Sequence, residues 1–274
     1  MGIFKKKNDE ELAAVYREKG FYSEEYIQVF RSRHPKMNSD DHCTLCEIYA
    51  EMGRFEDAQN ELFAVRPGMI LDDITTGQQL YCHILLSMCS GRYKDAYSTF
   101  RDNARFLDRF MSNPVRSRIA GDYYSSVASL IALFSGKSTV SATSGSETGV
   151  NALAEAENSS DSSSEKASSS DNSASSSKGF AAAFFGSTKK GDAASEVRKY
   201  MARLREWCDI FPKHRILLDI TEVALLFAQN KEEAEDAAAK CRTNILGFSG
   251  FEYEWQRDYF LKKLDRATRL TLSE

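Results

Sequence analysis

Apolar residues recur along most of this chain at intervals of three and four positions, the spacing that places them on one face of an α-helix. Three of these stripes comprise Leu45, Ile48, Tyr49 and Met52; Leu80, Ile84 and Met88; and Val197, Tyr200, Met201, Leu204 and Trp207. No segment alternates apolar and polar residues as a half-buried strand does. The pattern therefore predicts an all-α protein.

Polar residues and glycines mark where the predicted helices begin and end. The first helix is expected to begin at Asn8 or Asp9 and to end before Gly20. Ser23 is a suitable N-cap for the second helix, because its hydroxyl can accept a hydrogen bond from a free backbone N–H of the first turn. The cluster Asn38-Ser-Asp-Asp41 predicts another N-cap in the same way.

A short motif occurs twice between predicted helices. Gly53-Arg-Phe-Glu-Asp-Ala58 is followed later by Gly91-Arg-Tyr-Lys-Asp-Ala96. Glycine readily adopts the left-handed conformation that ends many helices. The aromatic residue would fill the corner of the turn, and the alanine would let the second helix approach the first. The motif predicts paired antiparallel helices.

The residues around these turns resemble tetratricopeptide repeats, in which a leucine, a small residue and a tyrosine precede an alanine in the second helix. Leu45, Cys46, Tyr49 and Ala58 occupy those positions in the hairpin that begins at His42. The next hairpin keeps Gly91, Tyr93, Ala96 and Phe100 but has Ile84 where a small residue is usual.

This resemblance implies an α-α hairpin solenoid, that is, an array of stacked helix pairs. We expect helical hairpins in residues 1–136, with the best match at 38–110, and further hairpins that complete the solenoid in 191–274. Residues 137–190 between them are rich in serine. Such a composition buries too little apolar surface to offset the entropy of ordering, so we expect a disordered insert.

In tetratricopeptide proteins the first helices of the hairpins line a concave groove that binds peptides. The resemblance implies that the corresponding residues here are Glu47, Tyr81, Leu85, Met88, Tyr123, Leu130, Leu133 and Phe134. The alternative is that these residues pack against the C-terminal helices. Glu47 speaks against a clamp for a free carboxylate, because it would repel one.

The segment Gly179-Phe-Ala-Ala-Ala-Phe-Phe-Gly186 differs from the serine-rich sequence around it. Phe180, Phe184 and Phe185 would suit a docking segment, since apolar anchors on neighbouring turns are how a helix binds in a groove. They would equally suit the start of the following helix.

The sequence favours neither a metal site nor a catalytic site. His42, Cys43 and Cys46, with Cys82-His83, have spacings that a zinc site would use, but Cys46 already fills a packing position of the repeat. We therefore expect reduced thiols and no metal. None of the four histidines lies in a nucleophile motif, and no phosphate-binding loop is present. The prediction is no catalytic residue and no cofactor.

The net charge and the N-terminal residues limit the possible partners and locations. The net charge of −4 provides no general attraction for nucleic acid. No signal peptide follows Met1-Gly-Ile-Phe-Lys-Lys-Lys7, and no apolar run is long enough to span a bilayer. The sequence predicts a cytoplasmic adaptor or scaffold that binds a protein or peptide. Two alternatives are a peripheral membrane adaptor that uses Lys5–Lys7, and an unrecognised enzyme.

Overall fold

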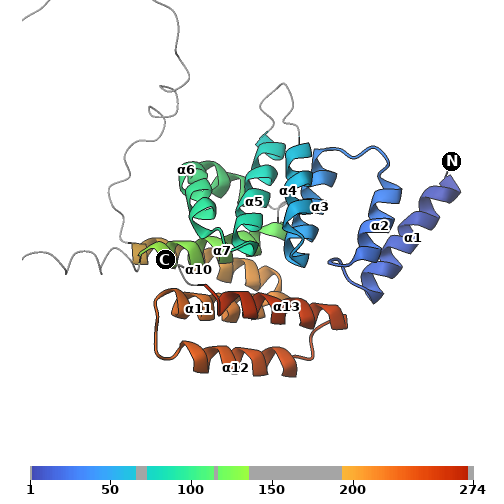
Figure 1. Ribbon diagram of the computed structural model, residues 1–274. Helices are drawn as coiled ribbons and strands as arrows, with labels where there is room; N and C mark the ends of the chain where they lie inside the picture. Colours follow the sequence, from blue (N-terminus) through green and yellow to red (C-terminus); the bar gives the residue numbers. More distant parts are fainter. Residues whose placement is uncertain (1, 66–72, 114–116, 136–192, 271–274) are drawn as a thin grey trace, which may run out of the picture.

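The computed structural model describes residues 2–65, 73–113, 117–135 and 193–270, with only the backbone described for residues 2–9. Within these ranges the chain forms eleven α-helices, one short 3-10 helix and no strand (Figure 1). The predicted all-α class is therefore confirmed for the described residues. The predicted insert at 137–190, including Phe180, Phe184 and Phe185, lies outside them.

The helices account for most of the described residues. In chain order they are α1 (Gly2–Glu18), α2 (Glu24–Arg33), α3 (Ser39–Met52), α4 (Phe55–Ala64), α5 (Asp73–Cys89), α6 (Tyr93–Met111), α7 (Ser117–Ser135), α10 (Ala193–Ile210), η2 (Pro212–His214), α11 (Ile216–Ala228), α12 (Ala234–Gly247) and α13 (Glu254–Ala267).

Consecutive helices pack in pairs: α1 with α2, α3 with α4, α5 with α6, α7 with α10, and α11 with α12. The pairs are joined because α3 lies beside α5, α6 and α5 contact α7, and α7 lies beside α11. The last helix, α13, packs on α11 and α12 (Figure 1). None of the described helices combines the length and the apolar composition needed to cross a membrane.

The predicted N-caps are confirmed. The Ser23 hydroxyl accepts a hydrogen bond from the Tyr26 backbone N–H at 3.2 Å. Asn38 and Asp41 form a reciprocal capping box, in which the side chain of each residue accepts from the backbone N–H of the other. The predicted start of the first helix is wrong, because α1 already begins at Gly2.

The repeated glycines are left-handed C-caps, as predicted, with φ of 81° at Gly53 and 76° at Gly91. After Gly53, the Arg54 N–H bonds to the Tyr49 carbonyl at 2.9 Å and the Gly53 N–H bonds to the Ala50 carbonyl at 3.1 Å. This pair of bonds is the Schellman motif, and it recurs at Gly91. An added Cβ would meet no atom within 4 Å at either position. Glycine is therefore favoured there by the left-handed backbone conformation alone and not by packing.

One core runs through all the helix pairs. Its most deeply buried side chains include Leu45, Ile48, Ile84, Leu107, Leu130, Leu204, Ile245 and Leu264. Burying each such side chain contributes roughly 1.5–3 kcal/mol. Because these residues come from both sides of residues 136–192, the N- and C-terminal helices form one folded body.

Helices α7 and α10, which flank residues 136–192 in the sequence, are the most extensively packed pair. Tyr200 of α10 contacts Tyr123 and Tyr124, and its hydroxyl donates to Asp108 of α6 at 2.8 Å. Further along α10, the Trp207 ring lies against Gly121, nearer the start of α7. The two helices are therefore antiparallel partners.

Candidate functional site

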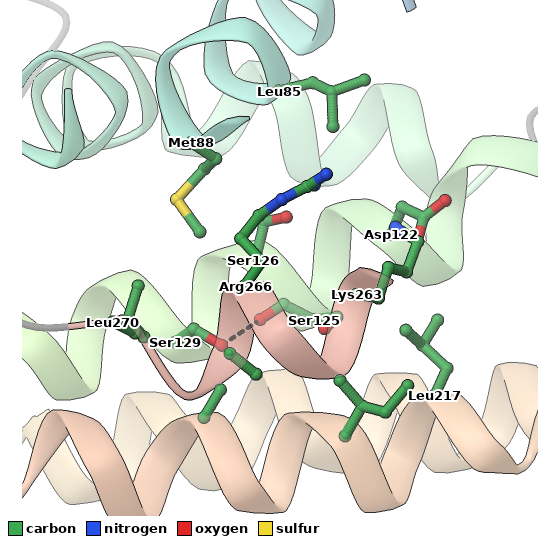
Figure 2. A pocket seen from close by; sticks show the side chains of 13 residues that line it. Leu85, Met88, Asp122, Ser125, Ser126, Ser129, Leu217, Lys263, Arg266 and Leu270 are labelled. Carbon is green, nitrogen blue, oxygen red and sulfur yellow. Dashed lines mark hydrogen bonds and ion pairs between the residues drawn. The ribbon is translucent and has the colours of Figure 1, made fainter. Parts of the chain in front are cut away.

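Helix α13 covers the face formed by α3, α5, α7 and α11, which we call the inner face. In Figure 2, Leu85 and Met88 of α5, Ser125 and Ser129 of α7 and Leu217 of α11 surround Lys263, Arg266 and Leu270 from the C-terminal segment. The space left between them is only ≈ 60 Å³. Ligand pockets are usually several times larger, so this space is not a peptide site.

Buried charges connect α13 to this face. The Lys263 ammonium donates to Asp122 at 2.7 Å and to Glu51 at 3.3 Å, and Arg266 donates to Glu51 at 2.8 Å. The side chains of Glu51 and Lys263 are only 4% and 10% exposed. Burial by itself would raise the pKa of Glu51, but Lys263 and Arg266 hold that pKa at about 2. Glu51 and its basic partners Lys263 and Arg266 are therefore all charged at neutral pH.

A larger opening, the aromatic cleft, lies beside this network. It has a volume of ≈ 410 Å³ and lies where the residues following α1 meet α3, the start of α7, the end of α10 and the start of α13. Nine aromatic side chains line it: Tyr16, Phe21, Tyr22, Tyr26, Trp207, Phe251, Trp255, Tyr259 and Phe260. Its size and lining are those of a ligand-binding site.

The rings of the aromatic cleft hold one another in place. Tyr16 meets Trp255 edge to face with centroids 5.2 Å apart, and Tyr22 stacks on Tyr259 at 4.7 Å. Gly20, with φ of 88°, lies directly against the Trp255 ring, and a Cβ there would come within 2.6 Å of it. Position 20, two residues after the end of α1, must therefore be glycine for both its conformation and its packing.

Arg118 and Glu47 form an ion pair in the wall of the aromatic cleft, which Lys213 and Glu252, paired at 3.5 Å, also line. Arg118, at the start of α7, donates to both carboxylate oxygens of Glu47, at 2.7 and 2.8 Å. Glu47 is 5% exposed, whereas Arg118 is 58% exposed and its guanidinium lies over the Phe21 ring. Within the described part of the chain, two of the five guanidinium N–H groups donate to Glu47, and the others can donate to a ligand.

Burial and neighbouring charges shift the pKa values of several groups that line the aromatic cleft. The Glu47 carboxylate raises the pKa of Arg118 further, and burial raises those of Tyr22 and Tyr259 well above the usual value. Burial lowers the pKa of His214, which favours its neutral form. The cleft is lined by these rings, by the Arg118 hydrogen-bond donors and by the charged side chains of Asp122, Lys213 and Glu252.

The groove residues expected from the sequence fall into separate places. Tyr81, Leu85 and Met88 of α5 are buried, and Leu85 and Met88 contact the covered space of Figure 2. Glu47 is also buried, beneath Arg118 in the wall of the aromatic cleft. The alternative that the sequence left open, packing against the C-terminal helices, is what the structure shows for Leu85 and Met88.

The α7 residues expected in the groove contact other helices of the fold. Tyr123 hydrogen-bonds to Asp108 of α6 at 3.3 Å, and Phe134 stacks on Tyr97 of α6 at 4.6 Å. Leu130 and Leu133 are buried in the core. The inner face of α7 instead carries Asp122, Ser125, Ser126 and Ser129. This helix is apolar on several sides because it lies between α5, α6, α10 and α11, so its pattern does not mark one face.

The histidine and cysteine side chains with spacings that a zinc site would use contact other protein groups. His42 Nδ1 contacts Glu61 at 2.7 Å, and His83 Nδ1 contacts Thr99 at 3.1 Å. The Cys82 thiol donates to the Cys43 carbonyl at 3.4 Å, and hydrogen bonding with its neighbours, together with burial, raises its pKa well above the usual value. Among the described residues no cluster of histidine, cysteine or acidic side chains could hold a metal ion.

Sequence reasoning missed the aromatic cleft because its walls come from opposite ends of the chain. A usable signal was present: Tyr16, Phe21, Tyr22 and Tyr26 form a dense aromatic run near one end, and Phe251 to Phe260 form a second near the other. Arg118 carried no such signal, since it is one arginine among many and its partner Glu47 lies 71 residues away.

We compared the chain with models of protein families, with curated protein sequences and with solved structures, and found no match in any of the three.

Proposed function

We propose that this chain is a non-catalytic adaptor that binds an aromatic-containing segment of a partner protein in the aromatic cleft. We also propose that its helix pairs form a tetratricopeptide-like solenoid. Support for the solenoid comes from the matching Schellman turns at Gly53 and Gly91 and from the succession of helix pairs.

The observation that carries the proposal is the combination of nine rings with the outer N–H groups of Arg118 in one ≈ 410 Å³ cleft. Rings of this kind bind another aromatic side chain in edge-to-face or offset-stacked contact. The outer N–H groups of Arg118 can donate to a backbone carbonyl beside that side chain. Aromatic and arginine residues also dominate the energetics of known protein interfaces.

The partner is expected in the aromatic cleft rather than on the inner face. The inner face, which corresponds to the peptide groove of the resemblance, is covered by α13. The aromatic cleft adjoins this face at Asp122 and Leu217, and Arg118 covers the charge of Glu47, so Glu47 does not repel a hydrogen-bond acceptor there. The proposed site is thus displaced toward α1, α7 and the start of α13.

The test is selection of peptides from a displayed random library on the full chain. We expect enrichment of peptides with a Phe, Tyr or Trp anchor. Phe21→Ala should weaken binding of a selected peptide roughly 30-fold, as expected for a central interface aromatic worth about 2 kcal/mol. Phe63→Ala is the matched control, because Phe63 is 75% exposed on α4 and does not line the cleft.

Thermal unfolding of both variants separates a loss of binding from a loss of folding. If Phe21→Ala stays folded and binds the selected peptides as well as Phe63→Ala does, the aromatic cleft is not the binding site. Enrichment of peptides without any aromatic residue would also contradict the proposal.

A further inference from the structure

We propose that the aromatic cleft has an occupant within this chain: the segment 179–186, whose phenylalanine side chains would bind there in competition with a partner. The inference rests on the proposed function, because it assigns to the same cleft a ligand of the same chemistry. Under this proposal, one segment of the adaptor competes with the partner protein for the aromatic cleft.

The chemistry of the segment matches the lining of the cleft. Phe180, Phe184 and Phe185 are the only aromatic residues between positions 136 and 192. The alanines and glycines around them add no bulk and no charge. A phenylalanine ring gains free energy by leaving water, and an edge-to-face contact with another ring adds to that gain.

The attachment points allow the segment to reach the cleft. Trp207, in the cleft wall, lies 14 residues after Ala193, which corresponds to about 21 Å along α10. Phe184 precedes Ala193 by nine residues, and nine extended residues span about 30 Å. Phe180 has a still longer reach. The connection to Ser135, on the other side, is much longer and imposes no limit.

Tethering makes even a weak interaction significant. A segment that belongs to the same chain as its site has an effective concentration of about 1 mM. If the free segment binds with a Kd of about 0.1 mM, the tethered segment would occupy the cleft roughly ten times more often than not, and a partner would bind about ten-fold more weakly.

The experiment measures binding of a fluorescein-labelled peptide, residues 178–190, to the full chain by fluorescence anisotropy. Three proteins are compared: wild type, F180A/F184A/F185A, and the control S168A/S169A/S170A, which changes three serines of the same serine-rich sequence. We expect the peptide to bind the phenylalanine variant about ten-fold more tightly than wild type, with the control like wild type. Adding Phe21→Ala to the phenylalanine variant should remove that gain.

The chain supplies a second readout without a label. Its only two tryptophans, Trp207 and Trp255, both line the aromatic cleft. Their quenching by acrylamide should therefore increase in F180A/F184A/F185A and stay unchanged in S168A/S169A/S170A. Equal peptide affinities for wild type and the phenylalanine variant, with equal quenching, would overturn the inference.

The outcomes also separate this inference from the proposed function. If the 178–190 peptide binds neither protein while library-selected peptides bind both and lose affinity in Phe21→Ala, the segment is not the occupant and the adaptor proposal stands. If no peptide of either kind depends on Phe21, both proposals fail.

Discussion

Replacing Glu51 by glutamine tests whether the buried charges hold α13 on the inner face. Glu51→Gln keeps the shape of the side chain but removes the charge that pairs with Lys263 and Arg266. The pKa of about 2, against an ordinary 4.5, corresponds to about 3–4 kcal/mol of stabilisation at neutral pH, because each unit is worth about 1.4 kcal/mol. Measured losses for one partner of a buried pair are about 3–5 kcal/mol.

The pH dependence has a definite sign. A carboxylate whose pKa is lower in the folded state stabilises the protein above its unfolded pKa, and this contribution disappears as the pH falls through the folded pKa. For Glu51 the window runs from about pH 5 down to about pH 2. The stability difference between wild type and Glu51→Gln should therefore be largest near pH 7 and should shrink as the pH falls through this window.

Urea unfolding followed by tryptophan fluorescence at several pH values measures this difference. Glu222→Gln is the matched control, since Glu222 pairs with Arg205 at 3.6 Å with both side chains more than half exposed. An exposed pair contributes about 0–1 kcal/mol. A loss below 1 kcal/mol for Glu51→Gln at pH 7, or a loss that does not change between pH 7 and pH 3, would refute the reasoning.

Three further predictions concern the turns, the helix contacts and the thiols. Gly53→Ala should lower the free energy of unfolding by about 1–2 kcal/mol because of its left-handed backbone, and Gly53→Asn should cost less, as measured by urea unfolding. Gly121→Ala should destabilise the α7–α10 pair and alter tryptophan emission, because the new Cβ would lie 2.6 Å from the Trp207 ring; unchanged stability and emission would contradict this packing. Burial raises the pKa values of Cys89 and Cys241 to about 12, so both thiols should react slowly with a disulfide reagent at pH 8 until urea is added, and their contribution to stability should fall as the pH rises from about 9 to about 12. Rapid labelling of the folded protein would argue against this burial.

Local features of the fold could be predicted from the sequence. The N-caps at Ser23 and Asn38 and the left-handed turns at Gly53 and Gly91 depend on residues within four or five positions. Hydrogen bonds over such short distances are determined by local geometry. The helix pairs follow from them, because a short turn leaves the second helix antiparallel to the first.

The candidate site depended on contacts that no local pattern contains. Lys263 and Arg266 meet Glu51 across more than 200 residues, and Arg118 meets Glu47 across 71. Only the three-dimensional arrangement shows that Arg118 covers the Glu47 carboxylate, so that Glu47 does not repel an acceptor in the cleft. The serines that α7 presents to the inner face were likewise hidden, because a helix surrounded by other helices has no single apolar stripe.

The antiparallel pairing of α7 and α10 has a consequence for chain continuity. Their packing, with the α13 contacts to Glu51 and Asp122, joins the part of the fold before Ser135 to the part after Ala193 without using the covalent connection between them. The two parts are related as the halves of a split protein, which reassemble through a shared core. The fold would therefore be retained if a different domain replaced the connecting sequence, or if the halves were made as separate chains.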